Sequence, residues 1–407
     1  MSRIDELIQQ HCPDGVEYRA LEEVTTRSSN IKWAEASSVE HRYIDLSSVD
    51  RVTRRITQPM LISAGDAPSR AQQIVREGDV IFATTRPTQM RWAVIPRELD
   101  AQIASTGFCV LRPDQGRVLT NFLAHLLGAE RFRRYVEREQ VPGNYPSIPD
   151  RLVRLFRIPV PPMEVQREIV RVLDLFQSLE AELEAELEAR RRQYELHRDS
   201  LLSFERDGSR VKYLTLSEIA TEFGRGKSKH RPRNAAHLYG GDYPFVQTGD
   251  VRNAGHIVTN YSQTYSEAGL AQSKLWPKGT ICITIAANIA ETGILNFDAC
   301  FPDSIIGLIV DPDQARSGFV EYLLQSFKAS LQSLGEGSAQ DNINLATFEN
   351  QRFPIPSLAE QDRIVAVLDK FDALVNDLSV GLPAELAARR KQYEYYRDRL
   401  LTFQEAV

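Results

Sequence analysis

Two short segments of the chain carry side chains of the kind that contact nucleic acids. The first, Ala83–Trp92 (ATTRPTQMRW), follows an apolar run and places Arg86, Gln89 and Arg91 on one loop. The second, Gly224–Asn234 (GRGKSKHRPRN), has five cations: Arg225, Lys227, Lys229, Arg231 and Arg233. Such cations neutralise backbone phosphates, and arginine or glutamine can pair with base edges in the major groove. Both segments predict DNA contacts, although a solvated surface loop would have the same composition.

Four further residues are weaker candidates for the same role. Arg54 and Arg55 form a basic pair in a polar turn, and Gln247 and Asn288 are polar residues beside apolar, strand-like runs. Taken singly, each is as well explained by solvation. Together with the two segments, they indicate a cationic patch in each half of the chain.

The catalytic motifs of familiar nucleases, methyltransferases and nucleotide-binding enzymes are missing from the sequence. None of the nine lysines has Asp or Glu two residues before it, and no Asn-Pro-Pro-aromatic run of an amino-methyltransferase is present. The segment Thr221–Ser228 (TEFGRGKS) ends like a phosphate-binding loop, but Thr221 replaces its first glycine. The seven histidines lack metal-ligand spacing. The sequence therefore predicts no active site, metal or cofactor, while an enzyme with unrecognised motifs remains an alternative.

Charge and cysteine content narrow the class of protein. The net charge of −6 argues weakly against DNA binding. Its distribution is uneven, however, because residues 16–157 carry +4 and residues 158–206 carry −4. The four cysteines are scattered without a C-x-x-C pair, which favours reduced thiols in a cytoplasm. No signal peptide and no apolar stretch of bilayer length is expected.

An internal repeat organises the chain. Residues 158–176 (IPVPPMEVQREIVRVLDLF) match residues 353–371 (FPIPSLAEQDRIVAVLDKF) at nine of 19 positions, with an offset of 195. Residues 190–204 match residues 389–403 at ten of 15 positions, with an offset of 199. The sequence therefore predicts a tandem duplication, in which each unit is a globular segment followed by a long helical one.

The two globular segments predict mixed α/β domains. EGDVIFAT from Glu77 and KGTICITI from Lys278 favour a glycine turn followed by a strand, and FCVLRPD and GLIVDPD favour a second strand. The apolar spacing of residues 119–138 and 318–334 predicts helices. We expect domain borders at 1–157, 158–206, 207–352 and 353–407.

The helical segments predict a paired spacer. Apolar residues recur at steps of three and four from Val172 to Phe204, as in a coiled coil with a stutter. Leu179–Ala189 reads LEAELEAELEA, a four-residue unit written nearly three times. The second stripe continues past Gly381 and Pro383, which should interrupt or bend that helix. We expect the two helices to pair antiparallel; the alternative is that each packs on its own domain.

These features resemble the specificity subunit of type I restriction–modification enzymes over essentially the whole chain. The resemblance rests on the Pro-x-Pro…Glu-x-Gln-x-x-Ile-Val entry at 159–170 and its partner at 354–365. It also rests on the two Arg-Arg-(Arg/Lys)-Gln-Tyr-Glu helices that end in Arg-Asp-x-Leu-Leu-x-Phe, and on the opening run CPDGVEY from Cys12.

The resemblance implies an α+β fold with two mixed α/β target-recognition domains in a pseudo-twofold arrangement, separated by two long antiparallel coiled-coil helices. It implies a non-catalytic, cytoplasmic prokaryotic protein that reads a split sequence in double-stranded DNA, each domain taking one half. Two methyltransferase subunits would dock on the helices, and restriction subunits would add translocation. S-adenosylmethionine, ATP and Mg would bind those partners, with no membrane involved. The alternative is a helical scaffold that joins proteins without reading DNA.

Overall fold

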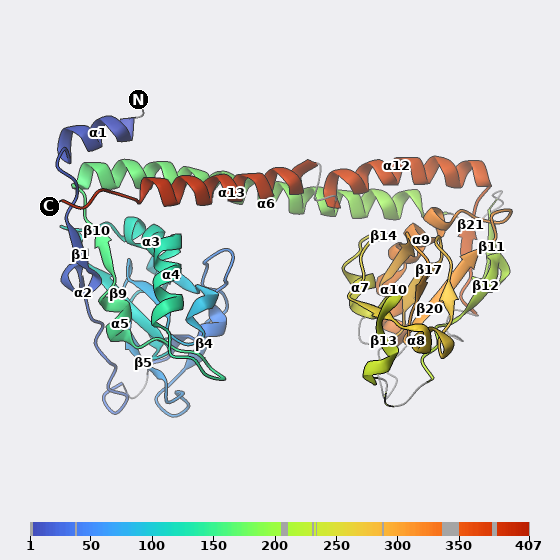
Figure 1. Cartoon of the computed structure of the whole chain (residues 1–407), viewed down its shortest axis with the longest axis horizontal. Helices are drawn as coiled ribbons and strands as arrows, with labels where there is room; N and C mark the ends of the chain where they lie inside the picture. Colours follow the sequence, from blue (N-terminus) through green and yellow to red (C-terminus); the bar gives the residue numbers. More distant parts are fainter. Residues whose placement is uncertain are drawn as a thin grey trace. The chain divides into compact units, whose positions relative to one another are not determined.

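The computed structural model describes residues 3–36, 39–204, 211–229, 232, 234–286, 289–335, 350–376 and 381–406. The chain divides into two compact units. Unit 1 comprises residues 1–182 and 387–407, and unit 2 comprises residues 183–386. Each unit therefore combines one globular part with portions of both helical segments, and each is described by itself (Figure 1).

The globular part of unit 1 is built on two four-stranded sheets and a separate strand pair. The sheets have the orders β2-β9-β6-β7 and β4-β3-β8-β5, and the pair is β1-β10. All pairings are antiparallel except β3 with β8. The strands are β1 (Tyr18–Ala20), β2 (Thr25–Thr26), β3 (His41–Ile44), β4 (Met60–Ile62), β5 (Ala71–Ile74), β6 (Val80–Ala83), β7 (Trp92–Val94), β8 (Ile103–Ser105), β9 (Phe108–Pro113) and β10 (Arg157–Pro159).

Unit 2 repeats this topology. Its sheets have the orders β12-β20-β17-β18-β14 and β15-β13-β19-β16, with the pair β11-β21 beside them. Here too a central pairing, β13 with β19, is parallel, and the additional edge strand β14 also pairs in parallel, with β18. The strands are β11 (Lys212–Leu214), β12 (Ala220–Arg225), β13 (Tyr239–Phe245), β14 (Ile257–Val258), β15 (Gln263–Tyr265), β16 (Leu275–Trp276), β17 (Ile281–Thr284), β18 (Thr292–Leu295), β19 (Ala299–Cys300), β20 (Ile305–Val310) and β21 (Phe353–Ile355).

The shared topology confirms the tandem duplication and the mixed α/β domains. The predicted strands are present as β6 and β9 in unit 1 and as β17 and β20 in unit 2. All four are almost entirely buried, which explains why they read as continuous apolar runs rather than as alternating patterns.

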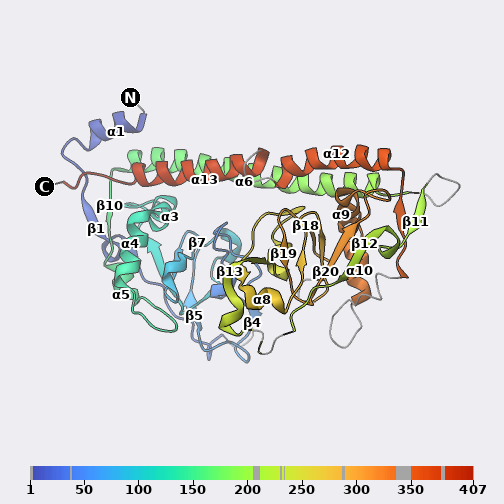
Figure 2. The same ribbon diagram turned by 45° about the vertical axis from the view of Figure 1, so that its right-hand side comes forward.

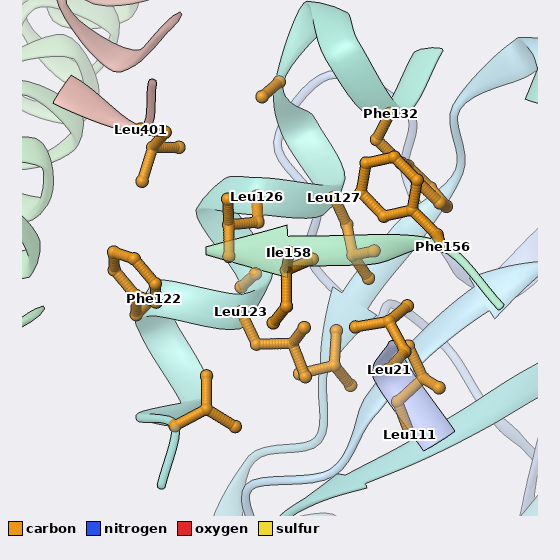
Figure 3. Close-up of a cluster of buried hydrophobic side chains, with 14 of the residues drawn as sticks. Leu21, Leu111, Phe122, Leu123, Leu126, Leu127, Phe132, Phe156, Ile158 and Leu401 are labelled. Atoms are coloured by element: carbon orange, nitrogen blue, oxygen red, sulfur yellow. The ribbon is translucent and has the colours of Figure 1, made fainter. Parts of the chain in front are cut away.

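The helices cover the sheets and carry the core of each unit. Those of unit 1 are α1 (Arg3–His11), α2 (Leu21–Val24), α3 (Thr120–Gly128), α4 (Glu130–Glu139) and α5 (Asp150–Arg154). Those of unit 2 are α7 (Thr248–Arg252), α8 (Glu267–Ala271), α9 (Ser317–Ser326) and α10 (Lys328–Gly335). The long helical segments form α6 (Met163–Leu201), α12 (Leu358–Asn376) and α13 (Gly381–Leu400). Figure 3 shows the core of unit 1, where Leu123, Leu127 and Ile158 gather between α3 and β10.

Two predicted helices are each broken in two. Residues 119–138 form α3 and α4 because Ala129 adopts an extended backbone (φ −75°, ψ 151°) that ends the first helix and begins the second. The break lets Phe132 and Val136 turn into the core. In unit 2 the break lies at Phe327, whose ring packs edge-on against Phe353 at 5.3 Å between centroids. Apolar spacing alone did not show these breaks, since both halves have inward-facing residues.

The first half of α6 pairs with α13 inside unit 1. Phe176 stacks on Tyr396 with centroids 5.5 Å apart, and Arg390 Nε donates to Glu180 Oε1 at 2.6 Å. Because the residue number rises along α6 as it falls along α13, the two helices run antiparallel. Figures 1 and 2 show these helices side by side.

The second half of α6 pairs in the same way inside unit 2. His197 stacks on Phe371 of α12 at 5.9 Å, whereas Leu187 shares a buried cluster with Leu386. The predicted antiparallel pairing is therefore confirmed within each unit. The interruption at Gly381 is also confirmed, since Gly381 has a left-handed φ of +69°, which a right-handed helix does not accommodate.

The helices also pack on their own domains, so the two predicted arrangements coexist. Ile169 and Leu173 of α6 are fully buried in the core of unit 1, and Ile364 and Leu368 of α12 are fully buried in that of unit 2. Each helix thus uses one face for its globular domain and another for its partner helix. The apolar stripe predicted from the sequence corresponds to the face that contacts the partner helix. It did not include the residues that face the globular domain.

Candidate nucleic-acid interface

Three loops of unit 1 are tied into one cluster, which we name the loop cluster: residues 45–56, 84–91 and 141–147. Arg54 Nη1 donates to the Met90 carbonyl, and Arg91 Nη1 donates to the Leu46 carbonyl. The Arg86 amide donates to the Pro146 carbonyl at 2.7 Å. Side-chain and backbone hydrogen bonds therefore hold predicted site residues of unit 1 in one place.

Two of the predicted arginines face inward. The Arg54 guanidinium lies 5.2 Å over the Trp92 ring, and its burial lowers the pKa of Arg54 below the usual value. Burial lowers the pKa of Arg91 as well. Because both side chains donate to backbone carbonyls, they support the loops, and their role in DNA contact stays a prediction.

The outward face of the loop cluster is cationic. Arg51, Arg55 and Arg86 are exposed, and none of them forms an ion pair with a described residue of unit 1. The nearby Asp50 accepts hydrogen bonds from the Thr53 and Val52 amides, which hold its pKa below the usual value. The carboxylate is thus occupied by the backbone, and the arginines remain available to a phosphate or a base.

The loop cluster also concentrates unusual backbone geometry. Arg54, Arg86 and Met90 adopt left-handed φ values of 59°, 50° and 49°. Such conformations cost free energy in residues other than glycine and tend to occur at functional sites. Gln89 lies half-buried in a short 3₁₀ turn between Arg86 and Met90. The turn therefore projects Arg86 at the price of local strain.

The basic loop of unit 2 leaves the end of β12. Arg225, Lys227 and Lys229 are exposed, and the Lys227 carbonyl accepts a hydrogen bond from Ser273 Oγ at 2.8 Å. Gly226 is required there, because a Cβ atom would lie 2.3 Å from the Phe301 carbonyl oxygen. Three other predicted residues, Arg231, Arg233 and Asn288, lie outside the described residues.

Gln247 has a structural contact that its sequence context did not indicate. It precedes α7, where its backbone carbonyl accepts a hydrogen bond from the Asp250 amide at 3.0 Å and its own amide donates to Asp250 Oδ2 at 2.8 Å. It is half-buried. Its backbone is therefore fixed at the start of a helix, and contact of its side chain with DNA stays a prediction.

Sequence reasoning missed Tyr145 and Arg51. The Tyr145 ring is 71% exposed and lies against the Arg86 guanidinium, whose Cζ is 5.0 Å from its centroid. The run Pro142–Pro146 (PGNYP) gave a usable signal, since an aromatic residue between prolines and glycine in a loop has no core to join. Arg51 lies three residues before Arg54 and forms a basic triplet with Arg54 and Arg55, but the intervening Val52 and Thr53 separate it from that pair in the sequence.

Metal-ligating clusters and membrane-spanning helices are absent from the parts of the chain that the structure describes. There, no group of three or more His, Cys, Asp and Glu residues could hold a metal ion. None of the described helices has an apolar stretch long enough to cross a bilayer.

Comparison with known proteins decides the family. A profile described as the type I restriction modification DNA specificity domain matches residues 23–189 and again residues 209–388. The chain belongs to the type I restriction–modification DNA specificity family. Each matched range of this specificity chain begins near the first sheet of a globular part and ends in a long helical segment.

Individual relatives agree with the profile. The specificity chain is 33% identical over 266 residues to the Escherichia coli EcoR124I/EcoR124II specificity subunit, covering 61% of this chain and 63% of that protein. It is 31% identical over 300 residues to a putative specificity subunit of Haemophilus influenzae, covering 70% and 69%. The match therefore spans slightly less than two thirds of the E. coli relative.

A solved structure extends the likeness to nearly the whole fold. Its description is "Structural basis underlying complex assembly and conformational transition of the type I R-M system". One of its chains is 26% identical and aligns with a TM-score of 0.69. The alignment covers 96% of this specificity chain and 98% of that chain.

Proposed function

We propose that the chain is the DNA-binding specificity subunit of a type I restriction–modification complex, in which each globular part reads one half of a split target. The observation that carries the proposal is the paired occurrence of the family's DNA specificity domain, at residues 23–189 and 209–388. Each copy has exposed cations on a loop that leaves a strand of its first sheet: Arg86 after β6 and Lys227 after β12. Divergent loops on a common topology suit two readers of different sequences.

The helical segments suit docking of two copies of one partner, which we take to be methyltransferase subunits. Leu196 of α6 and Tyr395 of α13 occupy equivalent positions of the repeat and are 74% and 60% exposed. Leu179 and Leu374 form a second equivalent pair, 40% and 57% exposed. Exposed apolar side chains at repeated positions are typical of interaction surfaces, and their duplication suits two equal partners.

The same proposal assigns the chemistry to other subunits. S-adenosylmethionine would bind the methyltransferase subunits, while ATP and Mg would bind restriction subunits that translocate DNA. The chain itself is proposed to be non-catalytic and to work in the bacterial cytoplasm. Methyl transfer by the purified chain, free of other subunits, would contradict this assignment.

Methylation mapping of the assembled complex tests the two-reader proposal. Lys227→Glu with Lys229→Glu should change sequence preference in one half of the target and leave the other half intact. Arg51→Glu with Arg55→Glu is the matched change in unit 1 and should alter only the opposite half. If either pair of substitutions altered both halves alike, the two globular parts would not be independent readers.

The helices are proposed to set the distance between the half-sites. One additional Leu-Glu-Ala-Glu unit after Glu186 would lengthen α6 by ~6 Å, whereas DNA rises ~3.4 Å per base pair along each strand. The insertion should widen the unspecified gap by one base pair and preserve both half-sites. An unchanged gap in the methylated sequences would show that the helix does not set the distance.

A scaffold that reads no DNA is distinguished by salt. Binding through phosphates weakens steeply as salt rises because counterions are released. The affinity of the assembled complex for duplex DNA should therefore fall steeply between roughly 50 and 200 mM salt, as expected for binding through phosphate contacts. A scaffold would show no binding at either concentration.

A further inference from the structure

Tyr145 is the exposed aromatic residue of the loop cluster, and its surroundings give it a specific task. We propose that Tyr145 is a positioning residue that holds the Arg86 guanidinium in the orientation needed to read a guanine in the half-site of unit 1. The inference rests on the proposed function and identifies which base this loop reads and how.

The backbone fixes the two loops that carry this pair. The Arg86 amide donates to the Pro146 carbonyl at 2.7 Å, and Thr85 forms an antiparallel bridge with Ser147. Just beyond the bridge, the Ile148 amide donates to the Thr84 carbonyl at 2.9 Å. The Tyr145 ring and the Arg86 side chain therefore start from backbones whose relative position is set by hydrogen bonds on both sides.

The side chains of Arg86 and Tyr145 contact each other on the surface of the protein. Arg86 and Tyr145 are both exposed, and the guanidinium carbon lies 5.0 Å from the ring centroid. In the described part of the chain, neither the guanidinium nor the phenol forms a hydrogen bond with another residue. The pair thus contributes nothing to a core, yet the backbone of Arg86 accepts a left-handed φ of 50° to form it.

Contact with a ring face leaves the donors of a guanidinium free along its edge. Arginine presents planar, forked N–H groups that match the O6 and N7 acceptors of guanine, the commonest specific contact in the major groove. A mobile arginine would have to lose rotamer freedom on binding, and an aromatic face lowers that cost by holding its plane beforehand. A phosphate contact needs no fixed plane, so this arrangement favours a base.

Unit 2 has no such pair at the equivalent place. The loop after β17, which corresponds to β6, reads Ala286–Ala290 (AANIA) and contains no arginine. The proposed reader is therefore specific to unit 1, and the effect of disrupting it should appear in one half of the target alone.

The test uses the complete complex with its methyltransferase subunits on a pool of duplexes randomised in both half-sites, followed by sequencing of methylated products. Tyr145→Ala should reduce the preference for guanine at one position about tenfold and leave the other half-site unchanged. Tyr145→Phe should retain the preference, because the ring and not the hydroxyl contacts Arg86. Leu61→Ala, at an exposed apolar residue of unit 1 outside the loop cluster, is the control and should have no effect.

The double variant Arg86→Ala with Tyr145→Ala identifies how Tyr145 acts. If Tyr145 works through Arg86, the double variant should equal Arg86→Ala alone, and Arg86→Lys should also lose the preference despite its retained charge. Additive effects, loss in both half-sites, or an unchanged preference in Tyr145→Ala would each overturn the proposal. A wild-type complex with no preference in either half would refute the proposed function itself, and this assignment with it.

Discussion

The two units join their globular part to a long helix at equivalent positions, but with different side chains. In unit 1, His125 of α3 donates through Nε2 to Asp174 of α6 at 2.8 Å. In unit 2, Tyr322 of α9 donates through its hydroxyl to Asp369 of α12, also at 2.8 Å. Asp174 and Asp369 are identical positions of the repeat. The duplication thus kept the acceptor on the helix and exchanged the donor on the domain.

Because the donors differ, the polar groups around the two junctions differ as well. In unit 1, Nδ1 of His125 lies 3.0 Å from the Tyr393 hydroxyl, which also accepts a hydrogen bond from Gln177. Although burial works in the opposite direction, hydrogen bonds from His125 and Asn121 hold the pKa of Asp174 below its usual value. The carboxylate is 40% exposed, so water shares its solvation.

In unit 2 a second carboxylate is buried beside the junction. Glu321 is fully buried, where unit 1 has Ala124 at the equivalent position. It binds Thr292 at 2.7 Å, Gln325 at 2.6 Å and His256 Nδ1. A buried carboxylate needs a partner of opposite charge, and His256 supplies it when protonated, a state that its raised pKa favours. A diverged domain can therefore use the same helix position only by building a different polar network around it.

The largest expected effect is the loss of His256. His256→Ala leaves Glu321 buried with only neutral donors and should cost about 3 kcal/mol of stability. The matched change in unit 1, His125→Ala, should cost about 1 kcal/mol, because solvent reaches Asp174. Hydrogen exchange of α9 and of α3 in the two variants measures both losses.

A double variant sharpens this result. His256→Ala combined with Glu321→Ala makes unit 2 resemble unit 1 and removes the stranded charge, so it should be more stable than His256→Ala alone. If the double variant were the less stable of the two, Glu321 would not depend on His256 for its charge balance.

A smaller difference in stability is expected between substitutions of Tyr194 and Tyr393, which occupy equivalent positions in the long helices. The Tyr393 hydroxyl hydrogen-bonds to His125 and Gln177, whereas the buried Tyr194 hydroxyl finds no partner among the described residues. Tyr393→Phe should therefore cost about 1 kcal/mol, and Tyr194→Phe should be neutral or stabilising. Urea unfolding of both variants measures the difference; equal costs would mean that the hydroxyl environments do not differ.

The smallest expected effect is a pH dependence with opposite sign in the two units. Burial lowers the pKa of His256, but the hydrogen bond and charge of Glu321 outweigh it, with Asp372 and Asp369 adding, so that the pKa is raised above 6.5. Tyr322 stacks on the imidazole at 4.1 Å and carries no charge. The stabilisation is full below pH 6.5 and is lost as pH rises through the pKa of the folded state.

In unit 1 the sign reverses. Because the pKa of Asp174 is lowered, its stabilisation is present above its ordinary pKa of 3.8 and is lost as pH falls through the folded-state value. Hydrogen exchange corrected for intrinsic rates should show α9 loosening toward alkaline pH and α3 toward strong acid. His256→Gln should abolish the alkaline response of α9 and leave α3 unchanged; persistence of that response would assign it to another group.

The sequence predicted features that depend on local pattern or on repetition. The buried strands β6 and β17, the antiparallel helix pairs and the interruption at Gly381 all follow from apolar spacing and from residues with special backbone behaviour. The break at Ala129 did not, since alanine is a good helix former and only the packing of Phe132 explains its extended backbone.

The candidate interface was predictable in part. The sequence marked the segment from Arg86 to Arg91 as basic, but which arginine turns inward depends on carbonyls of another loop, such as that of Leu46. Tyr145 is 59 residues from Arg86 along the chain and meets it through backbone pairing that no local pattern shows. His256 and Glu321 are likewise far apart in the sequence, by 65 residues.

The composition of unit 1 from residues 1–182 and 387–407 affects how the protein folds during synthesis. Val16 pairs in parallel with Glu405, and the Tyr18 hydroxyl donates to the Phe403 carbonyl at 3.0 Å. At 5–20 residues per second, a ribosome needs about 10–40 s to pass from residue 182 to residue 387. The unit translated first must therefore wait without Leu401, which lies near Leu126 (Figure 3), while unit 2 is translated in full. Nascent chains of the specificity subunit should consequently depend on holding chaperones during that interval, and the demand should end only when α13 leaves the exit tunnel.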